Sequence, residues 1–257
     1  MSDIYERVDI YRLLGNKSVL FMGDSIMRNI YKDLVYFITE RNPKGQLTRR
    51  RHLCAKGEDS FMGDTLVDYP DEVRFRNYVE TRDYHLQSKD IQLSFYFITR
   101  CYSDTVHEFF ANYKQKFGSY PDVIMVNSAL WDINRWGPSG IKSFNENIVS
   151  LMEMFTRILE DYTQVIWMTT PPISTEIRGG FQLKDLKFQQ LSMRFNIMEG
   201  NARAAFVTAQ HGFDVIDMHH HFANEIHRRA QDGVHWNPDA VRMQTNIFLT
   251  HVALSRG

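Results

Sequence analysis

The feature that most constrains this chain is a regular alternation of short apolar runs with segments of helical periodicity. Runs typical of buried strands are residues 19–22, 91–99, 122–126, 165–168 and 213–217. Helical patterns separate them, and a last one follows the fifth run. Because neighbouring parallel strands need a crossover connection and are covered on both faces, the alternation predicts an α/β fold with a mostly parallel sheet. We find no repeat or linker, so we expect one domain over residues 1–257.

Composition narrows the class further. The chain has 257 residues, of which 43% are hydrophobic and 24% charged, a balance that suits a globular protein with a sizeable core. A formal net charge of −1 gives no general attraction to nucleic acid or to anionic membranes. There is no apolar run of about 18 residues and no apolar signal core near the N-terminus. We therefore expect an intracellular, cytoplasmic monomer with no membrane span and no nucleic-acid partner.

Residues 53–90 interrupt the alternation. This stretch is polar and without clear periodicity until the run at 91–99, so it is predicted to be a long irregular loop, a kind of segment that is often functional. The basic cluster at residues 48–52 before it is predicted to be a solvated loop. Residues 42–45 and 178–180 carry glycine and proline in turn-forming combinations, and we expect them to end the neighbouring helical or strand segments.

Ser25 occupies the point where the first strand gives way to the first long helix. It closes the triplet Gly23-Asp24-Ser25, and Ile26 and Ile30 begin the helical pattern behind it. Free backbone N–H groups and the positive end of the helix dipole lie at such a position and favour negative charge. A serine hydroxyl there could attack a carbonyl carbon. The alternative reading is that Asp24 and Ser25 only cap the helix.

A histidine with an acidic neighbour follows the last strand. Asp232 precedes His235 by three residues, and Asn237-Pro238 then opens the final helix. A carboxylate at this spacing can orient one ring nitrogen while the other takes a proton from Ser25, which is the logic of a catalytic triad. Since both segments follow strand ends, one crevice at the carboxyl edge of the sheet could collect them. Taken alone, the pair is better explained by a capping Asp and a surface His, but together with Gly23-Asp24-Ser25 at the matching end of the same sheet it favours catalysis.

Two further groups invite a functional reading. Arg28 lies three residues after Ser25 on the same helix face, so it could hold an anionic or acyl group of a substrate, or simply pair with Asp24. His219, His220 and His221 are consecutive and cannot all reach one ion without unusual backbone geometry. We therefore expect no metal and no cofactor.

These motifs resemble a known superfamily. Segments 23–29 and 232–236 resemble the GDSL/SGNH hydrolases, and within that superfamily the chain closely resembles the PC-esterase domain-containing protein family. The segments that carry this likeness are residues 30–35, 95–100, 127–132, 179–181 and 217–222. The resemblance covers about residues 14–253 and implies a three-layer α/β/α, flavodoxin-like fold.

The resemblance also implies roles for individual residues. Ser25 would be the nucleophile, His235 the base and Asp232 its orienting acid, in a metal-free acyl esterase. The Ser25 backbone N–H, Asn127 and Gly57 would stabilise the oxyanion, with Gly63 as a second choice for the glycine. The substrate would be a small-molecule or glycan-like acyl ester. The alternative is a catalytically silent scaffold that uses the same crevice to bind a partner.

Overall fold

A seven-stranded sheet runs through the molecule with the strand order β2-β3-β4-β1-β5-β6-β7. The computed structural model describes residues 5–42, 46–55, 57–69, 76, 78–178 and 188–255. Five strands are parallel, and they confirm the five apolar runs; they are β1 Lys17–Gly23, β4 Ile91–Phe97, β5 Val123–Val126, β6 Gln164–Met168 and β7 Asp214–Ile216. Their carboxyl ends meet at one edge, where the functional residues were expected.

The prediction of an irregular loop over residues 53–90 was wrong in part. This stretch contains β2 Thr65–Asp68 and β3 Thr81–Leu86, which extend the sheet in antiparallel fashion beyond β4. Strand β3 could not be predicted from its hydrophobic pattern because one of its inward-facing residues is charged. Arg82 is completely buried and is paired with acidic side chains. A strand with such a residue lacks the alternation of apolar and polar residues that identifies half-buried strands.

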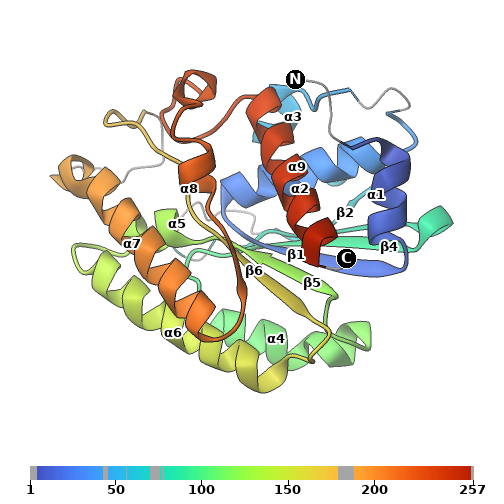
Figure 1. The fold of residues 1–257 in the computed structure, drawn as a ribbon, viewed down its shortest axis with the longest axis horizontal. Helices are drawn as coiled ribbons and strands as arrows, with labels where there is room; N and C mark the ends of the chain where they lie inside the picture. Colours follow the sequence, from blue (N-terminus) through green and yellow to red (C-terminus); the bar gives the residue numbers. More distant parts are fainter. Residues whose placement is uncertain are drawn as a thin grey trace.

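Helices cover both faces of the sheet, which confirms the three-layer α/β/α sandwich (Figure 1). One layer contains α1 Arg7–Leu14, α2 Ser25–Ile38 and α9 Pro238–Ser255. The other contains α4 Asp104–Phe117, α6 Gly140–Ile158 and α7 Gln190–Gln210. Three short helices escaped prediction: α3 Arg50–Cys54, α5 Ala129–Arg135 and α8 Met218–His221. Each of these has seven residues or fewer, too few to display a helical period.

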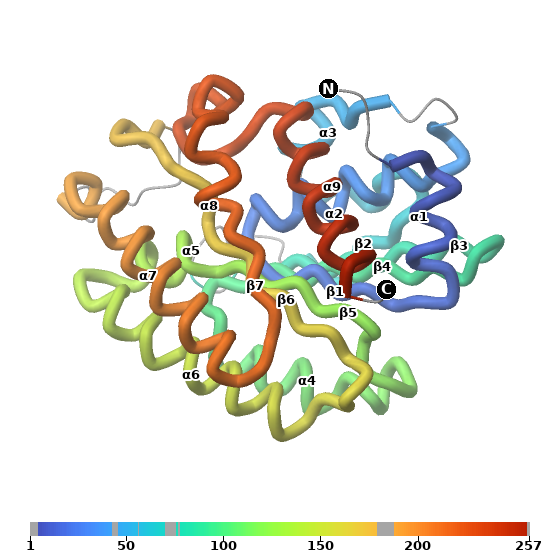
Figure 2. The backbone as a smooth tube through the Cα atoms, in the orientation of Figure 1, coloured from blue at the N-terminus to red at the C-terminus, as the bar shows by residue number. Residues whose placement is uncertain are grey.

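The outer helices form where capping and apolar spacing predict them. Ser103 accepts a hydrogen bond from the Val106 N–H, and Asn237 accepts one from the Ala240 N–H, so both act as N-caps. Helices α2 and α9 lie side by side although they come from opposite ends of the chain (Figure 2). The buried Arg242 of α9 ties them together by an ion pair with Asp33 of α2 at 2.8 Å.

Other predictions from the sequence were wrong or concern residues that the structure does not describe. The basic cluster is not a simple solvated loop, because α3 begins at Arg50 and the preceding Thr48 is buried with its hydroxyl on Asp33. Residues 43–45 and 179–187 lie outside the described residues; they include most of the two expected turns, the family-like segment 179–181, and Leu186, where the sequence pattern predicts the start of a long helix. In the parts of the chain that the structure describes, no helix combines the length and the apolar character needed to cross a membrane.

Candidate active site

The end of β1 places Ser25 at the carboxyl edge of the sheet. The strand ends at Gly23, Asp24 is the N-cap, and Ser25 is the first residue of α2. Glycine is required at position 23, since a Cβ atom there would lie 2.6 Å from the Asn127 carbonyl oxygen. The Asp24 Oδ1 accepts a hydrogen bond of 2.8 Å from the Ile26 N–H. The cap reading of Asp24 is thus confirmed, and it leaves the Ser25 hydroxyl available for another partner.

Asp232 and His235 are carried on a short hairpin-like loop between β7 and α9. Arg229 and Trp236 form an antiparallel bridge at its base, and the Ala230 N–H donates to the His235 carbonyl at 2.7 Å. At its turn, Gly233 has φ = 81°, a left-handed conformation that favours glycine. The Gly233 carbonyl also accepts a hydrogen bond of 2.7 Å from the Ser174 N–H. The loop is therefore fixed at its base and at its tip.

The structure brings Ser25, His235 and Asp232 together in one hydrogen-bonded chain. The Ser25 Oγ lies 2.7 Å from His235 Nε2, and His235 Nδ1 lies 2.9 Å from Asp232 Oδ2. An ionised carboxylate only accepts hydrogen bonds, so Nδ1 carries the proton and Nε2 is left to accept the Ser25 hydroxyl proton. This is the arrangement needed for a base-activated serine nucleophile.

Asp232 is suited to remain ionised in this chain. Partial burial acts to raise the pKa of Asp232, but hydrogen bonds from the His235 side chain and from two backbone N–H groups outweigh it. The result is a pKa held well below the ordinary value of an aspartate. The two N–H donors belong to Val234 and His235, and both reach Oδ1 at 2.9 Å. The carboxylate is thereby both charged and fixed in orientation.

Asp24 is a second carboxyl group near the hydrogen-bonded side chains of Ser25, His235 and Asp232. It is completely buried, and its burial raises its pKa to about 6, although the Ile26 N–H and the charge on His235 act in the opposite direction. Its Oδ2 atom has no hydrogen-bond partner within the described residues. The pKa of Asp24 is therefore shifted in the opposite direction from that of Asp232.

The candidate oxyanion donors differ in whether their N–H groups already donate a hydrogen bond within the protein. The Ser25 N–H, at the first position of α2, donates to no acceptor among the described residues. Asn127 follows β5 as expected, but its buried amide Nδ2 already donates to the Met168 carbonyl at 2.7 Å and to the Thr170 hydroxyl at 3.2 Å. Gly57 has φ = 69° and packs against the Tyr69 ring, which gives a structural reason for glycine there.

Arg28 is held by a partner that the sequence did not suggest. Its Nη1 atom lies 2.6 Å from Glu80 Oε2, and its side chain is buried. Glu80 also accepts a hydrogen bond of 2.8 Å from the Tyr78 hydroxyl. The expected alternative, an ion pair between Arg28 and Asp24, is not formed, because the Arg28 guanidinium pairs with Glu80 instead.

That ion pair is part of a larger cluster, which we call the buried ionic network. Three cations and three carboxylates interlock; they are Arg28, Lys32 and Arg82 with Glu58, Asp64 and Glu80. Arg82 is central, at 2.7 Å from Glu80 and 3.2 Å from Asp64. Its residues come from α2, from β3 and the residue before it, and from the loop before β2. One local signal was available, because Glu80 and Arg82 are two apart and face the same side of a strand.

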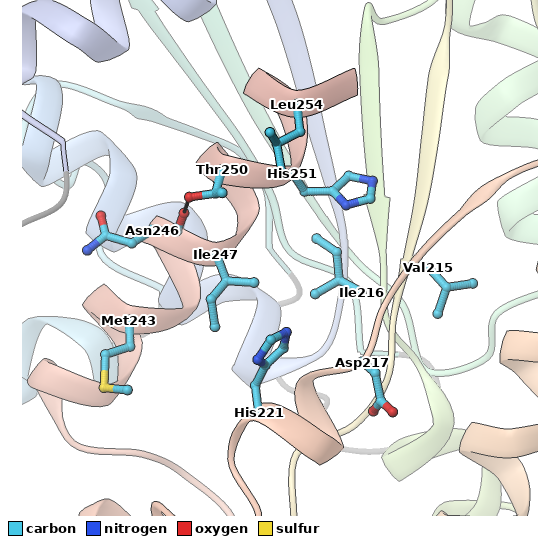
Figure 3. Close-up of a pocket in the computed structure, with 10 residues that line it drawn as sticks. All are labelled: Val215, Ile216, Asp217, His221, Met243, Asn246, Ile247, Thr250, His251 and Leu254. Atoms are coloured by element: carbon cyan, nitrogen blue, oxygen red, sulfur yellow. Dashed lines mark hydrogen bonds between the residues drawn. The ribbon is translucent and has the colours of Figure 1, made fainter. Parts of the chain in front are cut away.

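The three consecutive histidines do not converge. His221 lines a cavity of about 450 Å³ between β7 and α9, together with Ile216 and Ile247 (Figure 3). His219 lines a different cavity, of about 270 Å³. Among the residues that the structure describes, no group of three or more His, Cys, Asp or Glu side chains could hold a metal ion.

Solved structures of low sequence identity have the same fold. The acetyl xylan esterase AlAXEase superposes with a TM-score of 0.52 at 13% identity, over 91% of this chain and 99% of its own. The acetylxylan esterase Axe2 from Geobacillus stearothermophilus gives a TM-score of 0.50 at 14% identity, over 93% and 95% of the two chains. The fold is therefore that of the SGNH-type esterases.

Sequence comparison then identifies the relatives. Human PC-esterase domain-containing protein 1A is 35% identical over 252 residues, which are 97% of this chain and 54% of the human protein. Human PC-esterase domain-containing protein 1B is 34% identical over 249 residues, 95% of this chain and 56% of its own length. No family model matches. The chain is a homologue of the PC-esterase domain-containing proteins and spans about half the length of the curated relatives that it matches.

Proposed function

We propose that this chain is a serine-dependent acyl esterase with Ser25 as nucleophile, His235 as base and Asp232 as the orienting acid. The observation that carries the proposal is the hydrogen-bonded chain from Ser25 Oγ through both nitrogens of His235 to Asp232. The side chains of His235 and Asp232 are 26% and 30% exposed, so a substrate can approach them from solvent. The fold and the names of the relatives support the same chemistry.

In the proposed reaction, His235 Nε2 takes the Ser25 hydroxyl proton as Oγ attacks the ester carbonyl carbon. The tetrahedral intermediate collapses to an acyl-serine, and the alcohol leaves with the proton held by His235. Water then attacks the acyl-serine with His235 again as base, which releases the acid and restores Ser25. The reaction uses no metal and no cofactor.

The first oxyanion donor in this proposal is the Ser25 backbone N–H, which is unpartnered in the described residues. Asn127 and Gly57 remain the candidates for a second donor. Asn127 would have to release Met168 or Thr170 in order to serve. A single donor typically contributes about 10²–10³ in rate, so the number of donors affects how fast the enzyme can be.

For the substrate class we propose a small-molecule or glycan acyl ester. Two solved structures that share the fold are acetyl xylan esterases by name, so short acyl esters on sugars are the first compounds to test. Arg28 is a less suitable substrate ligand than its position suggested, because its guanidinium is committed to Glu80.

A catalytically silent scaffold is the second candidate function. The observation that favours it is the engagement of the Asn127 amide by Met168 and Thr170, which leaves one clear oxyanion donor among those expected. On this account the crevice binds a partner without turning it over.

A fluorophosphonate probe distinguishes the two. It reacts covalently with an activated serine, so the wild-type protein should be labelled and Ser25→Ala should not. Ser60→Ala, which changes an exposed serine, is the matched control and should label normally. Labelling of Ser25→Ala at the wild-type level would refute the assignment of the nucleophile. A folded wild-type protein that never labels would favour the scaffold.

A further inference from the structure

A second cavity beside the catalytic loop has an unusual chemical character. It has a volume of about 270 Å³ and lies between the segment after β6, helices α7 and α8, and the segment around Arg229. Its charged and titratable lining groups are Arg194, His219 and Arg229, and Ser174 and Thr175 add hydroxyl groups. Among the described residues that line it, none is Asp or Glu. The described part of the cavity wall therefore carries positive charge and no carboxylate.

The two arginines lack acidic partners. Within the described residues, no carboxylate lies within ion-pair distance of Arg194 or Arg229, and the hydrogen bond that Arg229 makes is a long one, 3.4 Å to the Pro172 carbonyl. Arg229 is half-buried, and its pKa is lowered by that burial and by the charge of Arg194. Arg28 and Arg82, by contrast, have carboxylates at 2.6 and 2.7 Å. A cation partly withdrawn from water, as Arg229 is, is ordinarily paired, and Arg194 places a second, exposed guanidinium at the same cavity, so the two together can accept an anion.

His219 adds a directed polar atom to the same cavity. Its Nδ1 lies 3.0 Å from the Thr170 carbonyl and 3.3 Å from the Asn201 Nδ2; the nearer carbonyl can only accept, and the Asn201 amide donates to that same carbonyl, so we assign the proton to Nδ1. The same carbonyl accepts a hydrogen bond from the Asn201 amide at 2.9 Å, which fixes the position of this partner. The Nε2 atom of His219 has no partner in the described residues. It can accept a ligand hydroxyl when neutral and donate to an anion when protonated.

We propose that this cavity, which we call the arginine pocket, binds the carboxylate or phosphate group of an anionic ligand through Arg194 and Arg229. Guanidinium groups match the planar oxygen pairs of carboxylates and phosphates and bind them with two parallel hydrogen bonds. The volume of about 270 Å³ suits a small acid or a single charged group, just below the range of about 300–1,000 Å³ typical of drug-sized ligands.

The arginine pocket adjoins the loop that carries the base. Arg229 bridges to Trp236, the residue after His235, and Ser174 in the pocket wall donates to the Gly233 carbonyl. The anionic group could therefore belong to the ester substrate itself or to a separate small acid that binds next to the active site. Both sources share the same chemistry, and they differ in what happens to the kinetics when an arginine is removed.

Binding is measured first, on the Ser25→Ala protein, so that the result does not depend on esterase activity. Inorganic phosphate and succinate are titrated at constant ionic strength, and the melting temperature is followed. We expect both anions to raise it, since a ligand of the folded state stabilises that state. Arg194→Gln and Arg229→Gln should each weaken binding by about 10-fold or more.

Arg203→Gln changes an exposed arginine on the same helix that does not line the pocket, and it should bind the anions normally. Melting temperatures that ignore both anions would overturn the proposal. So would anion binding that is equal in the two pocket variants and the control. Arg194 is exposed, so its variant is expected to fold even if the Arg229 variant does not.

Kinetics then distinguish the source of the anion. If the group belongs to the substrate, Arg229→Gln should raise KM for the p-nitrophenyl ester of succinate, which has a free carboxylate, and leave p-nitrophenyl acetate unchanged. If the ligand is a separate acid, both esters should respond alike while phosphate binding is lost. Either result supports the arginine pocket. Failure of the proposed esterase activity would leave the binding measurement intact.

Discussion

Helix α2 takes part in two charged clusters that differ in almost every physical respect. At its first residue, Ser25 joins His235 and Asp232, whose side chains are 26% and 30% exposed. Further along the helix, Arg28 and Lys32 enter the buried ionic network, in which Arg82, Glu80 and Asp64 have no exposed side-chain surface. The first cluster is open and small. The second is larger and mostly buried, and its charges balance, with three cations and three carboxylates, of which Glu58 is 26% exposed.

The difference shows how burial decides what a charged group can do. In the proposed reaction a proton moves from Ser25 to His235 along their hydrogen bond, and the partial exposure of the site lets a substrate reach it. In the buried ionic network, every charged side chain except the partly exposed Glu58 has been taken from water at a cost, and partners from other elements hold it. Removing one partner leaves an unpaired charge in the interior, so changes in this cluster should lower the free energy of unfolding. Changes in the two clusters should therefore alter different measured quantities.

The largest expected effect is on catalysis. His235→Ala should lower the esterase rate by roughly 10⁴–10⁶-fold, because a triad without its base loses most of its advantage. The melting temperature should change little, since the ring is partly exposed. The rate is measured with p-nitrophenyl acetate and the melting temperature by circular dichroism. His220→Ala changes an exposed histidine and should keep the wild-type rate. Unchanged turnover in His235→Ala would exclude this residue as the base.

The next largest effect is on stability and comes from the centre of the buried ionic network. Arg82→Met should lower the free energy of unfolding by about 3–5 kcal/mol, because Glu80 and Asp64 are left buried with one cation fewer. For a chain of this size that corresponds to roughly 10 °C in melting temperature. The kcat of the protein that remains folded should stay within about threefold of wild type.

The matched control is Arg12→Met, which breaks an exposed pair with Asp9 at 3.6 Å. Pairs of this kind typically contribute about 1 kcal/mol or less. If Arg82→Met were no more harmful than Arg12→Met, the network would not be a folding element. A collapse of kcat in stable Arg82→Met protein would instead connect the network to the active site.

The two clusters were also unequally visible in the sequence. The parallel strands, the positions of Ser25, Asp232 and His235, and their meeting at one sheet edge followed from apolar runs and helix starts, which are local signals. Strand β3 did not, because a strand that buries Arg82 shows no local hydrophobic pattern. For Arg28, helix spacing indicated the correct face but not the partner, since Glu80 lies 52 residues away.

A third effect tests the buried ionic network by pH. Burial lowers the pKa of Lys32 to about 8 from 10.5, although Glu58 acts to raise it. The unfolded chain therefore binds more protons than the folded one between about pH 8 and 10.5, so the free energy of unfolding from this group increases with pH in that window. The increase amounts to at most about 3 kcal/mol.

Lys32→Met should remove this part of the pH dependence, which is measured by urea unfolding at pH 7.5, 9 and 10.5. The comparison is the difference between variant and wild type at each pH, because other groups titrate in the same window. Lys142→Met, an exposed lysine on α6, should leave the wild-type profile in place. A Lys32→Met profile parallel to that of wild type would show that this amine is not desolvated in solution.

The smallest expected effect tests whether Asn127 acts in catalysis or only stabilises the fold. Its amide joins the ends of β5 and β6 by donating to the Met168 carbonyl at 2.7 Å and the Thr170 hydroxyl at 3.2 Å. Asn127→Ala removes both bonds and leaves the buried Met168 carbonyl without this donor, which should cost about 1–3 kcal/mol of stability. On this structural account kcat changes by less than about 10-fold. An oxyanion donor behaves differently: its loss would lower kcat by about 10²–10³ with KM and melting temperature nearly unchanged. An Asn127→Ala protein with near wild-type kcat and lower stability would therefore place Asn127 in the scaffold.

Thr170→Val is the matched variant, because it removes one acceptor of the Asn127 amide and leaves one amide N–H free without changing Asn127 itself. If Asn127 belongs to the scaffold, Thr170→Val should lower the stability slightly and leave kcat unchanged. If Asn127 acts on the oxyanion, the freed donor should keep kcat or raise it, while Asn127→Ala abolishes most of it.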